Sequence, residues 1–281
     1  MLFNFKYLTI KRFGQSLSAD YKDAFGELES SYSELVNWVG RFALENIANS
    51  DMLYHDIEHT MLVTTVGQQI LIGKHLTAGG VSPRDWAHFI TALLCHDIGY
   101  VRGVCRLDRD GTYATGVGDE TITLPESATD ASLTAYHVDR SKQFVRERFG
   151  GTVLLDIDPE IIASYIEMTR FPVPDNPDYK DTDSYAGLLR AADFIGQLGD
   201  PDYLRKIPAL YYEFEETGAN AKAGYKNSHD MRRGYASFFW KEVSPYIRPA
   251  TRYLQATQDG KQWLANLHSQ VFQVEHSDVL D

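Results

Sequence analysis

The stretch FITALLCHDIGY, residues 89–100, joins an apolar run to a histidine–aspartate pair and is the most informative part of the chain. The apolar residues of 89–95 recur at helical spacing, which predicts a buried helix. Directly after this run come His96 and Asp97. Burying an imidazole beside a carboxylate is costly unless a third group compensates both, and a divalent cation would do so. The stretch therefore predicts a helix that ends at a buried metal site.

Helical spacing continues through most of the chain from about residue 18. Four pairs combine a capping side chain with a proline suited to the first helical position, and they predict four helix starts: Ser82-Pro83, Asp158-Pro159, Asp200-Pro201 and Ser244-Pro245. Alternating β-branched residues are scarce, and Thr121–Thr123 is expected to lie in a loop. We therefore predict an all-α fold.

The sequence shows no internal repeat and no linker rich in Pro, Gly and Ser. We expect a single compact multi-helix domain over residues 51–275, with residues 1–50 as an N-terminal helical segment that packs on the core or supports a homodimer. The longest irregular stretch is 106–128. A stretch of this length is expected to be either a lid or a surface excursion.

Composition excludes several classes of protein. With 27 basic and 39 acidic side chains among 281 residues, the net charge is −12, which argues against a nucleic-acid polymer as partner. No stretch approaches the roughly 20 apolar residues of a membrane span, so no membrane partner is expected. The two cysteines, Cys95 and Cys105, exclude a disulfide scaffold and indicate a reducing, cytoplasmic location.

Two further segments place metal-ligating side chains near apolar helices. In YHDIEH, residues 54–59, His55 and His59 are four apart and would share one face of a helix, so both could bind a metal, or one could bind while the other transfers protons. Asp193 follows the apolar residues of 188–192. Imidazole with carboxylate suits Zn²⁺, Mn²⁺ or Fe, whereas Mg²⁺ prefers oxygen ligands. A metal held this way can activate water at neutral pH.

These motifs resemble those of the HD-domain metal-dependent phosphohydrolases, and the closest pattern is the catalytic domain of class I cyclic-nucleotide phosphodiesterases. YHDIEHT (54–60) resembles that family's Y-H-N-x-x-H-A, and LLCHDIG (93–99) resembles its H-D-x-x-H stretch. Residues 191–218 are similar to the segment that begins at the family's metal-binding aspartate, and 237–267 are similar to its final helices. The likeness covers about residues 51–271.

The resemblance implies one or two divalent metal ions, Zn²⁺, Mn²⁺, Mg²⁺ or Fe, with Asp97 bridging two ions if both are present. It implies that the tightly bound ion is held by His59, His96, Asp97 and Asp193. His55 would be the general acid that protonates the leaving oxygen. Asp56, between the two histidines, would support these ligands or belong to a second metal or substrate site.

The chain also departs from the family pattern. Tyr100 stands where the family has a second histidine, and Tyr136-His137 stands where it has a His-His pair, which leaves His137 as the candidate for a second metal or substrate site. Phe238 matches the aromatic residue that clamps the nucleobase. Tyr235 occupies the place of the glutamine that fixes the purine, so hydrolysis of cyclic AMP or GMP is not implied. Gln197, one turn beyond Asp193, could face the same pocket.

We therefore expect a metal-dependent phosphohydrolase that cleaves a phosphodiester or phosphomonoester of a small nucleotide-like substrate. Two alternatives stay open from the sequence. HD-type folds also host di-iron oxygenases, which use more histidine ligands. A non-catalytic sensor could keep the metal as a structural clip or bind a nucleotide without cleaving it.

Overall fold

A computed structural model describes residues 4–151 and 157–276, and its architecture confirms the predicted all-α class. The α-helices are α1 (Phe5–Phe25), α2 (Ser31–Ile47), α3 (Ile57–Thr77), α4 (Pro83–Cys95), α5 (His137–Phe149), α6 (Pro159–Glu167), α7 (Tyr185–Leu198), α8 (Tyr203–Glu216), α9 (Ala219–Ala223), α10 (Ser228–Phe238), α11 (Ser244–Leu254) and α12 (Gln258–Glu275). Short 3-10 turns are η1 (Ile98–Tyr100), η2 (Asp130–Leu133) and η3 (Pro177–Lys180), and η4 (Phe239–Val243) is a π-helical segment.

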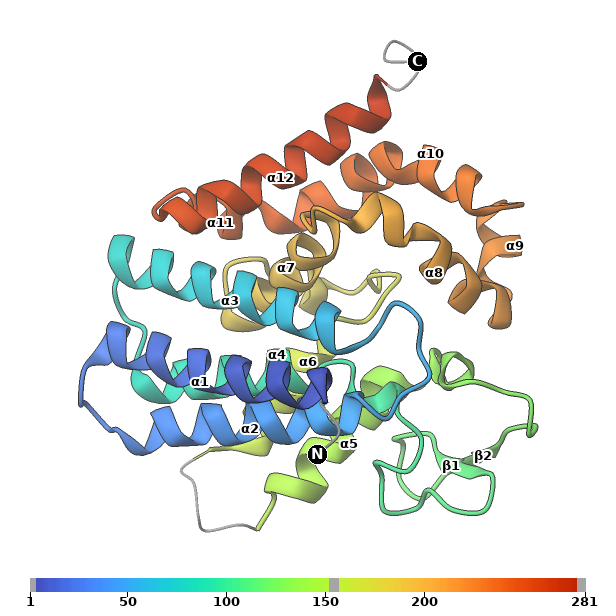
Figure 1. Cartoon of the computed structure of the whole chain (residues 1–281), viewed down its shortest axis with the longest axis horizontal. Coiled ribbons are helices and arrows are strands. Elements are labelled where there is room, and N and C mark those ends of the chain that lie inside the picture. Colours follow the sequence, from blue (N-terminus) through green and yellow to red (C-terminus); the bar gives the residue numbers. More distant parts are fainter. Residues whose placement is uncertain (1–3, 152–156, 277–281) are drawn as a thin grey trace.

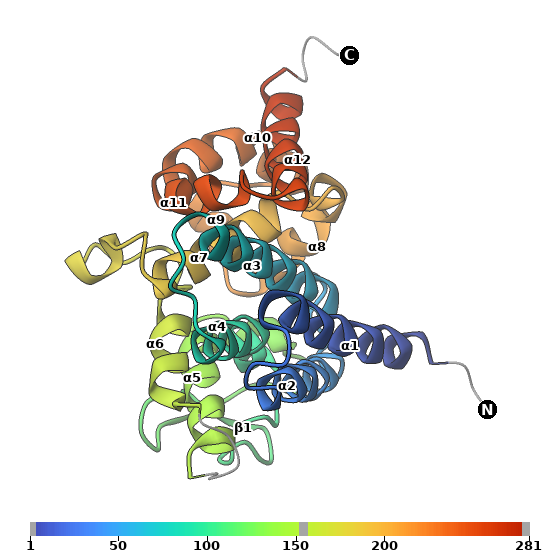
Figure 2. The same cartoon turned by 90° about the vertical axis from the view of Figure 1, so that its left-hand side faces the viewer.

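Helix α3 runs through the middle of the molecule, between the N-terminal helices and the C-terminal helices (Figure 1). It packs on α7, α4 and α11. Seen from the side, α10–α12 lie on one face of the α3–α7 layer, and α1, α2, α4, α5 and α6 lie on the other (Figure 2). Because neighbours surround α3, its sequence is apolar on several sides rather than on one stripe.

The buried apolar side chains form one large core cluster that extends from Leu17 in α1 to Val271 in α12. Helices α1 and α2 pack on each other, and α2 packs on α4, so residues 5–47 share this core. Among the described residues, no helix combines the length and apolar character that crossing a membrane requires.

Two of the four predicted helix starts are confirmed. Ser82 caps α4 by accepting the backbone N–H of Asp85 at 3.1 Å, and Asp158 caps α6, which begins at Pro159. The start predicted at Asp200-Pro201 lies two residues early, because α8 begins at Tyr203 after Asp202.

The helix start predicted at Ser244-Pro245 coincides with the first residues of α11, where Pro245 lies in the first turn, but Ser244 does not act as a cap. Helix α10, the π segment η4 and α11 follow one another without a break from Ser228 to Leu254. Pro245 has no N–H to donate, and the wider π turn before it accommodates that loss within a continuous helix.

The 106–128 stretch holds the only strands among the described residues. Strands β1 (Thr112–Ala114) and β2 (Thr121–Thr123) form an antiparallel hairpin with Tyr113 opposite Ile122, so Thr121–Thr123 is a strand rather than a loop. Arg140, fully buried on α5, donates to both carboxylate oxygens of Asp108 at 3.0 and 2.9 Å. The base of this stretch is therefore anchored to the core.

Candidate metal centre

The four side chains predicted to hold a metal converge from three helical segments. His59 lies at the start of α3, His96 and Asp97 follow α4, and Asp193 lies on α7. The Nε2 atom of His59 is 3.3 Å from Asp97 Oδ2 and 3.6 Å from Asp193 Oδ1, and His96 Nε2 is 3.1 and 3.6 Å from the same two oxygens. Four ligands at about 2.1 Å from one ion, in a tetrahedron, would be about 3.4 Å apart. The spacing fits such an ion.

Unpaired polar atoms in this cluster support the same reading. His59 Nε2, His96 Nε2 and Asp97 Oδ2 are buried and have no partner with hydrogen-bond geometry among the described residues. Such atoms are rare in folded proteins, and an ion bound at the centre would satisfy all three. His96 Nδ1 lies 2.7 Å from the carbonyl oxygen of Leu93, which can only accept, so Nδ1 carries a hydrogen and Nε2 is the atom that would bind an ion once the ring is neutral.

Without an ion, the two imidazoles and the two carboxylates stabilise each other's charged forms. Burial lowers the pKa of His59, but the carboxylates of Asp193 and Asp97 outweigh burial and raise that pKa to about 9. The same opposition raises the pKa of His96 well above its ordinary value. Burial raises the pKa of each aspartate, yet the nearby imidazoles outweigh burial. The pKa of Asp193 therefore falls to about 2, and the pKa of Asp97 lies well below its ordinary value.

We expect metal affinity to rise steeply with pH. Only a neutral imidazole can bind an ion, and the raised pKa values keep His59 and His96 protonated at pH 7, whereas both aspartates are already ionised. Release of two protons per ion predicts a gain of roughly 100-fold in affinity per pH unit. Chelator competition with Zn²⁺ or Mn²⁺ between pH 6 and 8 measures this slope, and an affinity independent of pH would contradict the assignment of these ligands.

Two features of the sequence bring α3 and α7 into place. Asp56 caps α3, and its Oδ1 accepts the backbone N–H groups of Glu58 at 2.8 Å and His59 at 3.1 Å. A Cβ atom on Gly196 would lie 2.7 Å from Val63 Cα, so glycine permits the close approach of the two helices. The structure thus shows Asp56 as the cap of α3, and its predicted role in supporting the ligands or in a second metal or substrate site stays a prediction.

His55 lies beside the centre, but on the loop before α3 and not on the helix that the spacing predicted. It lies before the first residue of α3, so the two histidines do not stack along one helical face. The rings of His55 and His59 are nevertheless 5.3 Å apart, and one ligand atom each of His55, His59 and Asp97 lie within 4.8 Å of one another. The loop before the helix therefore places His55 at the edge of the cluster.

Glu213 orients His55, and the sequence analysis did not single it out. Its Oε2 is 2.6 Å from His55 Nδ1, and its Oε1 accepts the backbone N–H of Tyr54 at 2.6 Å. Burial raises the pKa of Glu213, but His55 and these backbone donors outweigh burial and leave that pKa below its ordinary value. An ionised carboxylate can only accept, so His55 Nδ1 carries the hydrogen and Nε2 is left free. The sequence signal that could have indicated Glu213 is a carboxylate among the apolar residues of α8, between Leu210 and Phe214.

Tyr100 and His137 complete a stack of three rings with His55. Tyr100 lies 4.9 Å from His55 and 4.2 Å from His137, with interplanar angles of 27° and 7°. His137 Nδ1 is 2.7 Å from the carbonyl oxygen of Thr134, and its Nε2 is 3.9 Å from Asp97 Oδ1. A Cβ on Gly99 would come within 2.0 Å of the His137 carbonyl oxygen, so glycine allows η1 to lie this close to α5.

The three residues predicted for a substrate pocket have different surroundings. Tyr235 is buried, donates its hydroxyl to the carbonyl oxygen of Leu198 at 3.0 Å and packs on Tyr203, so the structure gives it a core role. Gln197 donates its side-chain amide to the Tyr203 hydroxyl at 3.2 Å. Phe238 is half-buried and contacts the exposed ring of Phe171 at 5.7 Å.

The side chains at the centre differ in their exposure to solvent. The side chains of His59 and His96 are 3% and 0% exposed, whereas those of His55, His137 and Asp193 are 13%, 14% and 19% exposed. The first two therefore form the floor of the site. A small molecule would approach through the other three.

Fold and site together define an all-α protein with a buried histidine–aspartate cluster that could hold a metal ion. The chain belongs to the Npun_R2479-like family, whose model matches residues 3–277. No curated protein matches the sequence.

Proposed function

We propose that this protein is a metal-dependent phosphohydrolase of the HD type, acting on a phosphodiester or phosphomonoester of a small nucleotide-like substrate. The convergence of His59, His96, Asp97 and Asp193, with three of their atoms buried and unpaired, carries the proposal. When bound, a divalent ion supplies charge that polarises a phosphoryl oxygen and lowers the pKa of a coordinated water. The two free, buried cysteines, Cys95 and Cys105, suit the reducing cytoplasm.

The charged groups around the site support a role for a metal. The pKa values of Asp97, Asp193 and Glu213 all lie below their ordinary range, so three carboxylates are ionised within this small region. In the metal-free site, the protonated imidazoles of His59 and His96 balance Asp97 and Asp193. A divalent ion that replaces their two protons would leave the total charge unchanged but concentrate the positive charge at one point, where a phosphate oxygen could bind.

His55 would hold the proton for the leaving oxygen. Its Nδ1–H donates to Glu213, which fixes the ring orientation and leaves Nε2 for the substrate. Its stacking partner Tyr100 restricts rotation of the imidazole. A positioned imidazole of this kind typically accelerates a reaction by roughly 10²- to 10⁴-fold.

An aromatic surface beside the centre supports a substrate with a planar group. Phe194 follows the ligand Asp193 on α7 and lies 6.3 Å from Phe171, which in turn contacts Phe238. Phe171 is 44% exposed. Aromatic rings gathered at a partly exposed place can stack on a nucleobase or a similar ring.

Hydrolysis of bis(p-nitrophenyl) phosphate and p-nitrophenyl phosphate tests the proposal. The protein is stripped with a chelator and reloaded with Mn²⁺, Zn²⁺ or Mg²⁺. Metal-dependent release from the diester establishes phosphodiesterase chemistry, and release from the monoester alone establishes a phosphatase. Absence of hydrolysis with every metal, in protein shown to hold the metal, would refute the proposal and favour the non-catalytic sensor. Two irons per chain with O₂ consumption would favour the oxygenase.

We expect His55→Asn to keep the metal and to lower kcat by roughly 10²- to 10⁴-fold. Glu213→Gln should lower kcat by roughly 10- to 100-fold, because a neutral amide holds the imidazole less firmly. Metal content and hydrolysis are measured on the same samples. Glu215→Gln, which changes an exposed carboxylate on the same helix, is the matched control and should behave as wild type. Loss of metal in His55→Asn would make His55 a ligand instead.

A further inference from the structure

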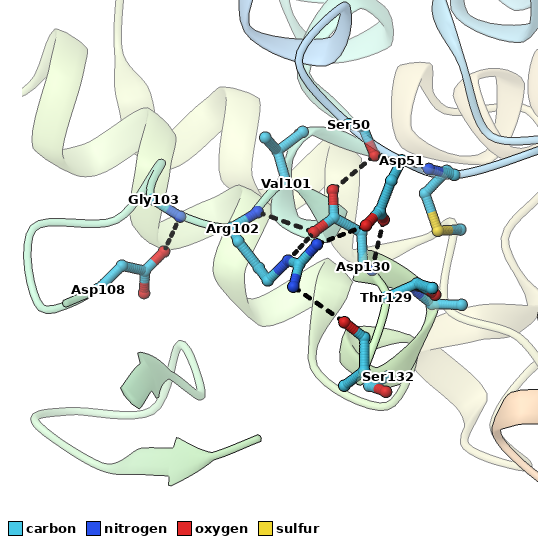
Figure 3. A network of polar contacts seen from close by, with 12 residues as sticks. Ser50, Asp51, Val101, Arg102, Gly103, Asp108, Thr129, Asp130 and Ser132 are labelled. Carbon is cyan, nitrogen blue, oxygen red and sulfur yellow. Dashed lines mark hydrogen bonds and ion pairs between the residues drawn. The ribbon is translucent and has the colours of Figure 1, made fainter. Parts of the chain in front are cut away.

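A second polar cluster lies outside the metal centre, and we name it the Arg102 clamp (Figure 3). Its members are Arg102, Asp130, Asp51 and Ser50. The guanidinium of Arg102 donates through Nε to Asp130 at 2.5 Å, through Nη2 to Asp51 at 2.5 Å and through Nη1 to the carbonyl oxygen of Ala128 at 2.9 Å. Asp130 is only 2% exposed and also accepts the hydroxyl of Ser50 at 2.7 Å. The planar fork of Arg102 thus joins its own segment to two others, residues 50–52 and 128–131.

Each clamped segment leads to one ring of the stack. Residues 50–52 immediately precede the loop that carries His55. Tyr100 lies two residues before Arg102. Residues 128–131 enter η2, after which the carbonyl oxygen of Thr134 binds His137 Nδ1. The clamp therefore sits at the common base of the three segments that supply the rings.

Apolar packing joins the clamp to the stack. Met52, Tyr100 and Ala131 form a small buried cluster separate from the main core, with one residue from each clamped segment. Asp51 Oδ1 also accepts the backbone N–H of Asp130 at 2.7 Å. If the clamp opened, this three-residue cluster would lose its alignment, and the ring of Tyr100 would move between its two neighbours.

We propose that Arg102 is a positioning residue that fixes the His55–Tyr100–His137 stack from outside the metal centre. It touches none of the three rings in this role and acts through the segments that carry them. A lysine keeps the charge but lacks the bidentate fork, so it cannot hold Asp130, Asp51 and the Ala128 carbonyl together. Of the four metal ligands, His59 lies on α3, Asp193 lies on α7, and His96 and Asp97 directly follow α4, so none of them is a member of the clamp.

The imidazole N–H signals of ¹⁵N-histidine-labelled, metal-stripped protein test this role without any assay of activity. In Arg102→Lys, the Nδ1–H signals of His55 and His137 should shift and broaden, while that of His96, bonded within α4, stays unchanged. Arg146→Lys is the matched control, because Arg146 is also bidentate, to Glu160, but is exposed and distant from the three segments. Asp51→Asn, at the half-exposed end of the clamp, serves as a second variant if Arg102→Lys does not fold.

Three wild-type-like N–H signals in folded Arg102→Lys would overturn the proposal, as would equal disturbance of His96. A kinetic measurement adds a readout that rests on the proposed function. In metal-loaded Arg102→Lys, kcat should fall roughly 10- to 100-fold, as for a modest misplacement of a catalytic group, with KM and metal content unchanged. If the wild-type protein hydrolyses nothing, the proposed function fails, whereas the N–H signals still decide the role of Arg102.

Discussion

Replacing Asp97 by asparagine is expected to remove metal binding and hydrolysis together. Asp97 Oδ2 lies 3.1 Å from His96 Nε2 and 3.3 Å from His59 Nε2, at the middle of the ligand set. Asparagine has nearly the same shape but brings no charge, so the ion loses both a ligand and part of its neutralisation. Because changes in groups that only support a ligand cost 10- to 100-fold in affinity, loss of the ligand itself should exceed about 100-fold.

Metal content by elemental analysis, measured beside hydrolysis, checks this expectation. Asp200→Asn is the control, because Asp200 is equally buried but binds the ammonium group of Lys206 at 2.7 Å. That variant should lose some stability and keep its metal. Full metal occupancy in folded Asp97→Asn would show that the ion, if any, is held elsewhere.

Replacing Arg140 by methionine is expected to cost about 3–5 kcal/mol of the free energy of unfolding. The guanidinium is fully buried and pairs with both oxygens of Asp108. It also donates to the carbonyl oxygens of Gly99, Val101 and Ala114 at 2.6, 3.0 and 2.6 Å. Methionine would fill much of the space but leave the Asp108 carboxylate buried without its partner, which is the main source of the cost.

Urea unfolding of metal-stripped protein measures the effect without the contribution of metal binding. Arg146→Met removes an exposed pair with Glu160 and should cost about 0–1 kcal/mol. A loss below about 1 kcal/mol in Arg140→Met would mean that water or another donor replaces the guanidinium. Gly99 lies two residues beyond Asp97, so loss of the donor to its carbonyl oxygen should also weaken metal affinity.

Three of the candidate ligands were predictable because each lies next to an apolar helical run in the sequence. His96 and Asp97 end an apolar helix, and Asp193 lies within another, so burial and the need for compensation can be read from neighbours in the chain. The placement of His55 was less predictable. Its spacing from His59 suggested a shared helical face, but the cap at Asp56 starts the helix after His55. Both outcomes bring the two rings together.

Residues whose partners lie far along the chain escaped prediction. Glu213 meets His55 across 158 positions, and Arg102 meets Asp51 across 51. Tyr235, for which a family position suggested a pocket, is buried and contacts Tyr203 and the Leu198 carbonyl oxygen. Local periodicity gives no information about such contacts.

By itself, the sequence determined the all-α class and two helix starts, since each depends on residues within a few turns of one another. The candidate ligand set of His59, His96, Asp97 and Asp193 came from the resemblance of separate motifs to a family pattern, and it stays a prediction. The tertiary structure alone decided that Glu213 orients His55, that Tyr100 lies between two imidazoles, and that Arg102 joins three segments. The physical reason is that packing of distant helices, with glycine at close approaches such as Gly196, sets which side chains meet.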